Sequence, residues 1–205
     1  MFARSITISG DPGAMDAGIA FIRDEAMPMV MQTEGCVGLS LVVDRQVGRA
    51  ITTSSWSTEE AMTQSREGLA ALRARGAEIT GGGEPMVDEW EVALMHRDHA
   101  LADGACCRVT WAKTHDMDSL IEMFRNQVLP QIEQAPGFCS ASMFVDRAGG
   151  RTCSTISFDS HAALDATRDL AATRRAESMK AADVEFTDVA EFDIVIAHLR
   201  VPELV

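Results

Sequence analysis

The stretch from Pro28 to Arg66, PMVMQTEGCVGLSLVVDRQVGRAITTSSWSTEEAMTQSR, recurs in altered form from Pro130 to Arg168 as PQIEQAPGFCSASMFVDRAGGRTCSTISFDSHAALDATR. The two stretches align without a gap, and every pair of aligned positions is 102 residues apart. A period this long exceeds that of solenoid repeats. The sequence therefore predicts a tandem duplication of a unit of about a hundred residues, with residues 1–97 as the first repeat and 98–205 as the second.

Hydrophobic periodicity predicts the same order of elements in both repeats. The first repeat is predicted to contain strands at 3–9, 38–43, 49–56 and 87–95 and helices at 16–32 and 57–75. The second is predicted to contain strands at 106–112, 138–145, 151–158 and 189–199 and helices at 116–134 and 160–179. Ser57 and Glu60 have the spacing of a capping box at the start of the first repeat's second helix, and Pro28 is expected to kink its first helix. The order β-α-β-β-α-β is that of a ferredoxin-like unit.

Apolar residues occupy both faces of the central predicted strands, as in the run Leu39 to Val43. Helices can cover one face of such a sheet, and the equivalent sheet of the other repeat is the simplest cover for the second. The expected fold class is therefore α+β, with two tandem ferredoxin-like βαββαβ units whose antiparallel sheets pack into a pseudo-symmetric barrel. Because one chain supplies both halves, we expect a monomeric pseudo-dimer or a homodimer.

Composition narrows the partners and the location. The 205 residues include 31 Asp and Glu against 18 Lys and Arg, for a formal net charge of −13. A surface of this sign repels phosphate backbones and anionic lipids, so we expect neither nucleic acid nor membrane as a partner. No stretch has the length of a signal peptide core or a spanning helix, and the five cysteines fit reduced thiols, so the expected location is cytoplasmic.

Two segments carry a resemblance to a known family. The run Pro136-Gly137-Phe138 precedes an alternating strand, and Trp56, Thr58, Glu60 and Ala61 lie where a strand ends and a helix begins. This pattern resembles that of the antibiotic biosynthesis monooxygenase family, whose members form dimeric α+β barrels. The resemblance extends over nearly the whole chain in two copies.

The resemblance implies a cofactor-independent monooxygenase that acts on an aromatic or quinol-type small molecule, with no cofactor. The family also includes haem-degrading enzymes, in which a histidine nine residues after the motif tryptophan ligates iron. Ser65 and Thr167 occupy that position here, so haem degradation is disfavoured. The alternative is a non-catalytic small-molecule-binding or structural protein that retains the fold.

Cofactor-free oxygenation needs groups that deprotonate the substrate and stabilise its anion in a dry pocket. The candidate catalytic residues are Arg66 and Arg168, one position past the family's histidine site, and His115 as general base. The alternatives are surface ion pairs for both arginines and a solvent-exposed loop position for His115.

Aromatic residues provide the candidate substrate-binding wall. Trp56 and Phe158 occupy the motif aromatic position, where core packing is the alternative role. Trp111 and Lys113 end the first strand of the second repeat, and His115 follows. In the 102-residue register these three positions correspond to Ser9, Asp11 and Gly13 of the first repeat. This asymmetry indicates the second half as the one with a working pocket.

The remaining polar residues give weaker patterns. Glu89 and Glu191 either face the barrel interior, where they must be paired or protonated and are candidates for a functional role, or lie at an exposed sheet edge, and the sequence leaves both alternatives open. The segment His96 to His99 has a loose metal-like spacing without a third ligand, and no metal site is predicted. Asp146 is expected opposite Arg151 in a hairpin, which would set Cys139 opposite Phe158.

Overall fold

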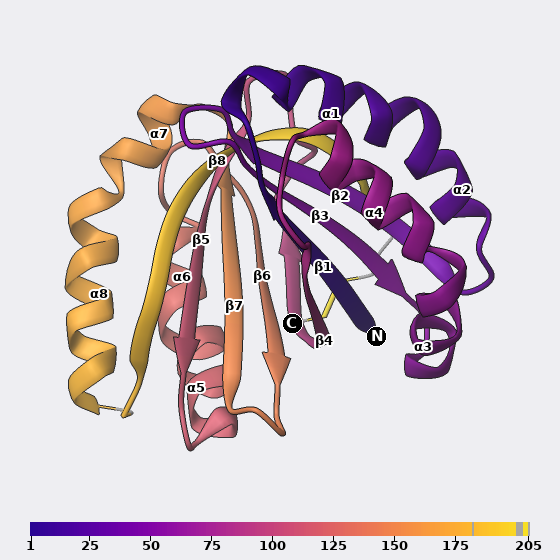
Figure 1. Cartoon of the computed structure of the whole chain (residues 1–205). Coiled ribbons are helices and arrows are strands. Elements are labelled where there is room, and N and C mark those ends of the chain that lie inside the picture. Colours follow the sequence, from indigo (N-terminus) through magenta and orange to yellow (C-terminus); the bar gives the residue numbers. More distant parts are fainter. Residues whose placement is uncertain (182, 200–202, 205) are drawn as a thin grey trace. The chain divides into compact units, whose positions relative to one another are not determined.

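The structure is a computed structural model that describes residues 1–181, 183–199 and 203–204. The first half contains β1 (Phe2–Ser9), η1 (Pro12–Ala14), α1 (Met15–Phe21), η2 (Ile22–Ala26), α2 (Met27–Gln32), β2 (Cys36–Asp44), β3 (Arg49–Trp56), α3 (Glu59–Gly68), α4 (Ala70–Ile79) and β4 (Met86–Arg97). The second contains β5 (Cys106–Lys113), α5 (Met117–Met123), η3 (Phe124–Val128), α6 (Leu129–Ile132), β6 (Phe138–Asp146), β7 (Arg151–Phe158), α7 (His161–Ala166), α8 (Arg168–Ala181) and β8 (Glu185–Leu199). Figure 1 traces these elements along the chain.

Hydrogen bonds join the strands in the closed order β1-β3-β2-β8-β5-β7-β6-β4. The pairs β1/β3, β2/β3, β5/β7 and β6/β7 are all antiparallel. Helices alternate with these strands in the β-α-β-β-α-β order of a ferredoxin-like unit. The predicted fold class, an α+β chain whose antiparallel strands close into a barrel, is confirmed.

The chain forms two compact units, and unit 1 includes a segment from far along the sequence. Of the described residues, unit 1 comprises 1–90 and 193–199, and unit 2 comprises 91–181, 183–192 and 203–204. The strands β4 and β8 therefore each begin in one unit and end in the other. The predicted repeat boundary after residue 97 is a division of the sequence and stays a prediction.

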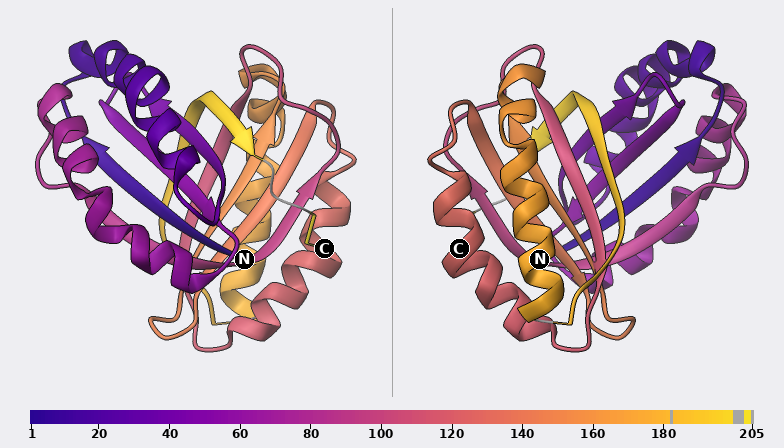
Figure 2. Two further views of the ribbon diagram at one scale, coloured as in Figure 1. Left: turned by 90° about the vertical axis from the view of Figure 1, so that its right-hand side faces the viewer. Right: turned by 90° about the vertical axis from the view of Figure 1, so that its left-hand side faces the viewer.

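Helices cover one face of the sheet within each unit. In unit 1, α1, α2 and α4 lie along β1, β2 and β3, and in unit 2, α5, α6 and α8 lie along β5, β6 and β7 (Figures 1 and 2). The unit 1 core is built around the buried Leu39, Trp56 and Met62. The larger unit 2 core includes Phe124 and Phe158.

Proline shapes the first helix of each unit. Pro28 has no N–H to donate, and the helix passes over it through the π-helical turn η2, in which the N–H of Met27 bonds to the carbonyl of Ile22. The turn η3 precedes Pro130 in the same way. The predicted kink at Pro28 is thus a π-turn inserted one turn earlier.

The second helix of each unit is interrupted, whereas one continuous helix was predicted. In unit 1, Thr58 rather than Ser57 caps the first segment, since its Oγ1 accepts from the N–H of Ala61 at 3.1 Å. In unit 2 the break falls at Thr167, whose hydroxyl donates to the carbonyl of Leu164 at 2.7 Å. A side-chain hydroxyl that bonds back to a helical carbonyl competes with the helix's own hydrogen bonds.

Glycine and alanine of the sequence motif touch in both units. Gly35 and Gly137 each have a φ of 79°, in the left-handed region that glycine adopts without strain. A β-carbon would lie 2.5 Å from Cβ of Ala61 at Gly35, and 2.8 Å from Cβ of Ala163 at Gly137. The motif therefore fixes how the second helix docks beside the turn that follows the first.

The gapless 102-residue register fails at the first strand. Phe2 pairs with Trp56 in unit 1, and Cys106 pairs with Phe158 in unit 2, so the first strands are 104 residues apart while the third strands keep 102. The loop from first strand to first helix is two residues longer in unit 1. Trp111 consequently corresponds to Thr7, and the predicted match of Trp111 to Ser9 is wrong.

A β-bulge in β6 makes one further predicted pairing wrong. Phe138 lies opposite Phe158 and Ser140 opposite Ser157, so Cys139 is the extra residue of a β-bulge and does not face Phe158. The expected hairpin pair is present, since Nε of Arg151 donates to Asp146 at 3.0 Å.

Candidate functional site

Unit 2 contains a cavity of about 100 Å³ between its sheet and its helices. Its walls are mostly apolar and include Leu120, Phe124, Met143, Ile156, Phe158 and Phe186. Three arginines also line it, namely Arg108 from β5 and Arg174 and Arg175 from α8. An apolar cavity with a few convergent polar groups is the usual form of a small-molecule site.

Arg108 is a buried cation that is fully paired. Only 6% of it is exposed, and its guanidinium donates to Oε1 of Glu191 at 2.8 Å and 3.1 Å. It also donates to Oγ1 of Thr167 at 3.0 Å and to the carbonyl of Leu164 at 3.2 Å. These contacts connect β5 to β8 and to the interrupted helix. Of the two alternatives for Glu191, the structure has the paired one.

Arg175 is the unpaired cation of the cavity. It makes no hydrogen bond or ion pair with any other residue that the structure describes. Burial lowers the pKa of Arg175 and the neighbouring charge of Arg108 lowers it further, while Glu191 acts in the opposite direction. Because an arginine in a protein keeps its proton, the cavity wall holds a half-buried positive charge that an anion would neutralise.

Arg174 adds a second potential donor. Its terminal nitrogens bond to Glu177 and Gln131. Its Nε is buried without a hydrogen-bond partner among the described residues. A buried donor left without a partner costs free energy that a ligand acceptor would recover.

Unit 1 contains an equivalent buried arginine paired with a glutamate. Arg4, 1% exposed, donates to Glu89 at 3.0 Å, to Oγ of Ser65 at 2.9 Å and to the carbonyl of Met62. Arg73, the counterpart of Arg175, has a pKa lowered first by burial and then by Arg4.

The unit 1 cavity is smaller, at about 50 Å³. Bulkier residues line it: Ile6 and Ile8 stand where unit 2 has Thr110 and Ala112, and Leu69 stands where unit 2 has Ala171. The smaller side chains at these three positions favour the larger cavity in unit 2.

Three predicted site residues at the end of β5 lie away from the unit 2 cavity. Trp111 and Lys113 alternate with the cavity-lining Thr110 and Ala112, so their side chains leave the opposite face of the strand. Trp111 instead makes an edge contact with Phe192, with ring centroids 6.5 Å apart. His115 is an exposed residue of the loop that follows the strand.

The other four predicted residues occupy the motif positions. Phe158 is fully buried and lines the cavity. Trp56 is fully buried in the unit 1 core, where its Nε1 donates to Ser54 at 3.0 Å. Arg66 and Arg168 each pair from a helix to a glutamate on a strand. Arg66 lies 2.5 Å from Glu89 of β4, and Arg168 lies 2.9 Å from Glu191 of β8.

The sequence reasoning missed Arg4, Arg108 and Arg175. The 102-residue register aligned Arg4 with Cys106, which hid the fact that both first strands carry arginine at their third position. A charged residue within an apolar strand, at the third position of both FARSITIS and CCRVTWAK, was the available signal.

The position of the haem-ligating histidine in the resembled family is part of the buried network. Ser65 Oγ accepts from Arg4 and donates to the carbonyl of Met62 at 2.7 Å. Thr167 does the same with Arg108 and Leu164. Both hydroxyls are buried and committed to protein partners.

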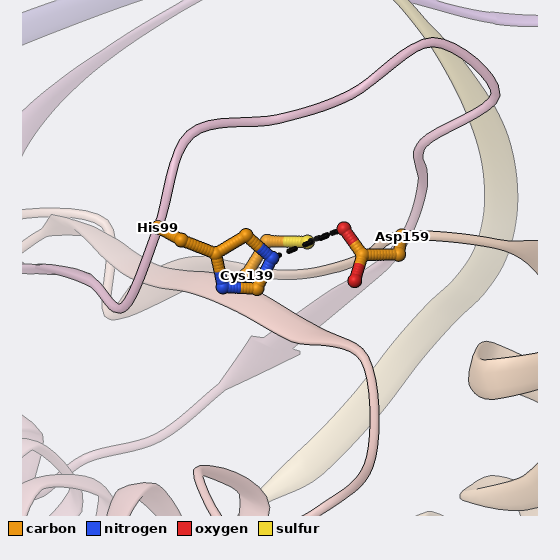
Figure 3. A group of neighbouring side chains, drawn as sticks. All are labelled: His99, Cys139 and Asp159. Carbon is orange, nitrogen blue, oxygen red and sulfur yellow. Dashed lines mark hydrogen bonds and ion pairs between the residues drawn. The ribbon is translucent and has the colours of Figure 1, made fainter.

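A second cluster of polar side chains lies elsewhere in unit 2. His99, Cys139 and Asp159 place an imidazole, a thiol and a carboxylate within 4.8 Å of one another (Figure 3). All three groups are common ligands of metal ions in proteins.

Solved structures share this fold at low sequence identity. The FN1347 protein of Fusobacterium nucleatum superposes with a TM-score of 0.71 at 8% identity, over 97% of this chain and 94% of its own. An anthrone oxidase-like protein superposes with a TM-score of 0.66 at 14% identity, over 100% of this chain and 94% of its own. A ferredoxin-fold protein of Listeria monocytogenes related to antibiotic biosynthesis monooxygenases gives 0.57 at 9% identity, with 95% of both chains covered. The resemblance predicted from the sequence motif is thus confirmed for the fold.

Sequence relatives define the family. Rv2557 of Mycobacterium tuberculosis H37Rv is 50% identical over 207 residues, which cover 100% of this chain and 92% of the relative. Rv2558 of the same strain is 47% identical over 210 residues, covering 100% of this chain and 88% of the relative. The chain belongs to the family of these two mycobacterial proteins. No family model matches the sequence.

Within the described part of the chain, every helix is too short or too polar to cross a membrane.

Proposed function

We propose that the unit 2 cavity binds a small aromatic molecule in its anionic form and that the protein oxygenates this molecule with dioxygen and no cofactor. The observation that carries the proposal is the unpaired cation of Arg175 in a mostly apolar cavity. The apolar walls suit an aromatic ring, and the cation suits a phenolate oxygen.

The cavity volume limits the substrate. An apolar cavity of roughly 150 Å³ is known in another protein to hold one benzene ring. The cavity here is about 100 Å³. A single ring is therefore the upper limit for the part of a substrate that the cavity encloses, and a polycyclic substrate is disfavoured.

The described lining residues include no histidine or carboxylate that could act as a general base. Arg175 supplies another route to the same intermediate, because a cation beside a phenol lowers the phenol's pKa and lets the proton leave to solvent. Arg108 adds little to this effect, since Glu191 neutralises it. The positive charge thus takes the role that His115 was predicted to have.

The reaction needs only the ionised ring and dioxygen. A carbon of the phenolate ring forms a bond to one oxygen of dioxygen. The outer oxygen then accepts a proton, which gives a ring hydroperoxide. Loss of one water, made of the outer oxygen, its proton and the ring hydrogen, leaves a quinone. Phenol plus O₂ thus gives quinone plus H₂O, with the ring oxidised and dioxygen reduced. The apolar walls would protect the ring anion from competing protonation by water.

A binding protein without catalysis is the second candidate, and the lack of a lining base among the described residues favours it. One experiment separates the two. The probe is 4-nitrophenol, a single ring whose phenolate absorbs visibly, titrated with the protein near neutral pH and followed by absorbance. Dioxygen uptake is then measured with a panel of monocyclic hydroquinones and phenols.

The matched variants are Arg175→Gln and Arg73→Gln, which remove equivalent cations from the two units. We expect Arg175→Gln to weaken binding of the phenolate by roughly tenfold to a hundredfold, the value of a charge-assisted hydrogen bond. Arg73→Gln should change it little. Binding with dioxygen uptake supports the oxygenase, and binding without uptake across the panel supports the binding protein. Binding that is equal in both variants overturns the site.

A further inference from the structure

We propose that His99, Cys139 and Asp159 form a binding site for one divalent metal ion of the zinc class. The three side chains come from separate parts of unit 2: the segment after β4, the bulge in β6 and the residue that follows β7. In Figure 3, dashed lines join His99 and Cys139 to the same carboxylate oxygen of Asp159. The site is independent of the cavity and of the proposed oxygenation.

The distances are close to those of a metal site. Nε2 of His99 lies 3.0 Å from Oδ1 of Asp159, and Sγ of Cys139 lies 3.2 Å from the same oxygen. Ligands of a tetrahedral zinc ion at their usual bond lengths are about 3.3–3.7 Å apart. These two donor pairs need to separate by only a few tenths of an ångström to admit the ion, and all three ligand atoms lie within 4.8 Å of one another.

The donor set selects the type of metal. Thiolate and imidazole bind zinc-class ions well, whereas calcium and magnesium require oxygen ligands. Three protein donors also leave a fourth tetrahedral position, and His99 and Asp159 are each about 40% exposed, at 41% and 42%, so a water can complete the site. This is the arrangement of open zinc sites rather than of closed structural ones.

Neighbouring residues orient the donors. Nδ1 of His99 bonds to Oδ2 of Asp98 at 2.8 Å, the carboxylate–histidine contact that fixes the tautomer of metal-binding imidazoles. The bulge at Cys139 turns its thiol, which is fully buried, toward Asp159.

Without an ion, the donors contact one another directly. The thiol of Cys139 donates to Oδ1 of Asp159, and Nε2 of His99 bonds to the same oxygen. A metal ion would replace these contacts, because thiolate, imidazole and carboxylate each bind a metal through a lone pair once deprotonated.

The other repeat provides no such site. In the 102-residue register, Val37 stands in the place of Cys139 and Ser57 in the place of Asp159, and neither offers a comparable ligand. One ion per chain is therefore expected.

The test uses the full chain and Co²⁺, which reports thiolate ligation through a charge-transfer band in the near ultraviolet, followed by displacement with Zn²⁺. We expect one equivalent to produce the band in the wild-type protein. Cys139→Ser should abolish the band, and Cys36→Ser, which removes a thiol from unit 1, should preserve it. His99→Ala, at an exposed position, should weaken Zn²⁺ binding at least tenfold.

Thermal unfolding distinguishes loss of the site from loss of the fold. Zn²⁺ should raise the melting temperature of the wild-type protein and of Cys36→Ser but not that of a folded His99→Ala variant. No thiolate band in the wild-type protein, a band that survives Cys139→Ser, or equal Zn²⁺ binding by His99→Ala would each overturn the proposal.

Discussion

The guanidinium of Arg108 lies 2.8 Å from the carboxylate of Glu191, and Arg4 lies 2.9 Å from Glu89 in the same arrangement. Each arginine is almost fully buried at the third position of a first strand, and each glutamate lies on a last strand. Each ion pair therefore joins the beginning of a ferredoxin-like repeat to its end.

Glu191→Gln should destabilise the protein by about 3 kcal/mol, because it leaves the buried Arg108 without its counter-charge. The estimate is at the lower end for such pairs since Glu191 is 29% exposed. The control is Arg168→Gln, which removes a partner of Glu191 that is 60% exposed and should cost less than about 1 kcal/mol. Urea unfolding of both variants measures the difference. Equal losses of unfolding free energy in the two variants would contradict the prediction that breaking the buried ion pair costs more.

Stability should fall in acid as Glu89 is protonated. Burial alone would raise the pKa of Glu89, but hydrogen bonds from Arg66 and Arg4 and their charges lower it below the ordinary value of 4.5. Between these two pKa values the unfolded state binds more protons. The stabilisation is therefore complete above about 4.5 and is lost as the pH falls through the folded-state pKa.

Glu89→Gln isolates that contribution. The gap in unfolding free energy between wild type and Glu89→Gln should narrow as the pH is lowered, as followed by urea titrations at several pH values. Glu84→Gln, at an exposed loop position, should show a gap near zero throughout. A Glu89→Gln gap that stays constant with pH would contradict the prediction.

Ala171→Leu should close the unit 2 cavity while leaving Arg175 in place. The substitution introduces the residue that unit 1 has at Leu69, where the cavity is half as large. We expect 4-nitrophenol binding to be lost and the melting temperature to be unchanged or higher, because the added side chain fills apolar space. Retained binding would place the ligand elsewhere.

Gly137→Ala should destabilise the protein by about 1–3 kcal/mol, since it strains a left-handed residue and drives a β-carbon against Ala163. Gly68→Ala is the control, because no atom lies within 4 Å of the added methyl group and the site is helical. That substitution should stabilise by about 0.5–1 kcal/mol. Chemical denaturation of both variants tests the contrast, which would fail if Gly137→Ala were neutral.

The fold could be predicted from sequence because it depends on local patterns. Strand and helix periodicity, the glycine before β6 and the capping residues each act over a few positions, and the two copies reinforced one another. The breaks in the two second helices, at Leu69 and at Thr167, were not predicted, because neither residue is a helix breaker by type.

The site depends on insertions and distant contacts, which the sequence does not show. Two extra residues in one loop shifted the first strands and hid the equivalence of Arg4 and Arg108. The partners of His99 lie 40 and 60 positions further along the chain, and a bulge aims one of them. Residues that come together only when the strands pair have no characteristic spacing in the sequence, so sequence motifs do not reveal them.

The last strand has a consequence for biosynthesis. Residues 193–199 pair with β2, so a nascent chain that has just completed its first hundred residues has an open edge on that strand. The ribosome must add almost the entire remaining polypeptide before that edge is closed. During translation the N-terminal half therefore exposes an unpaired strand edge, a surface that promotes aggregation, and separately expressed halves should recombine rather than persist as independent domains.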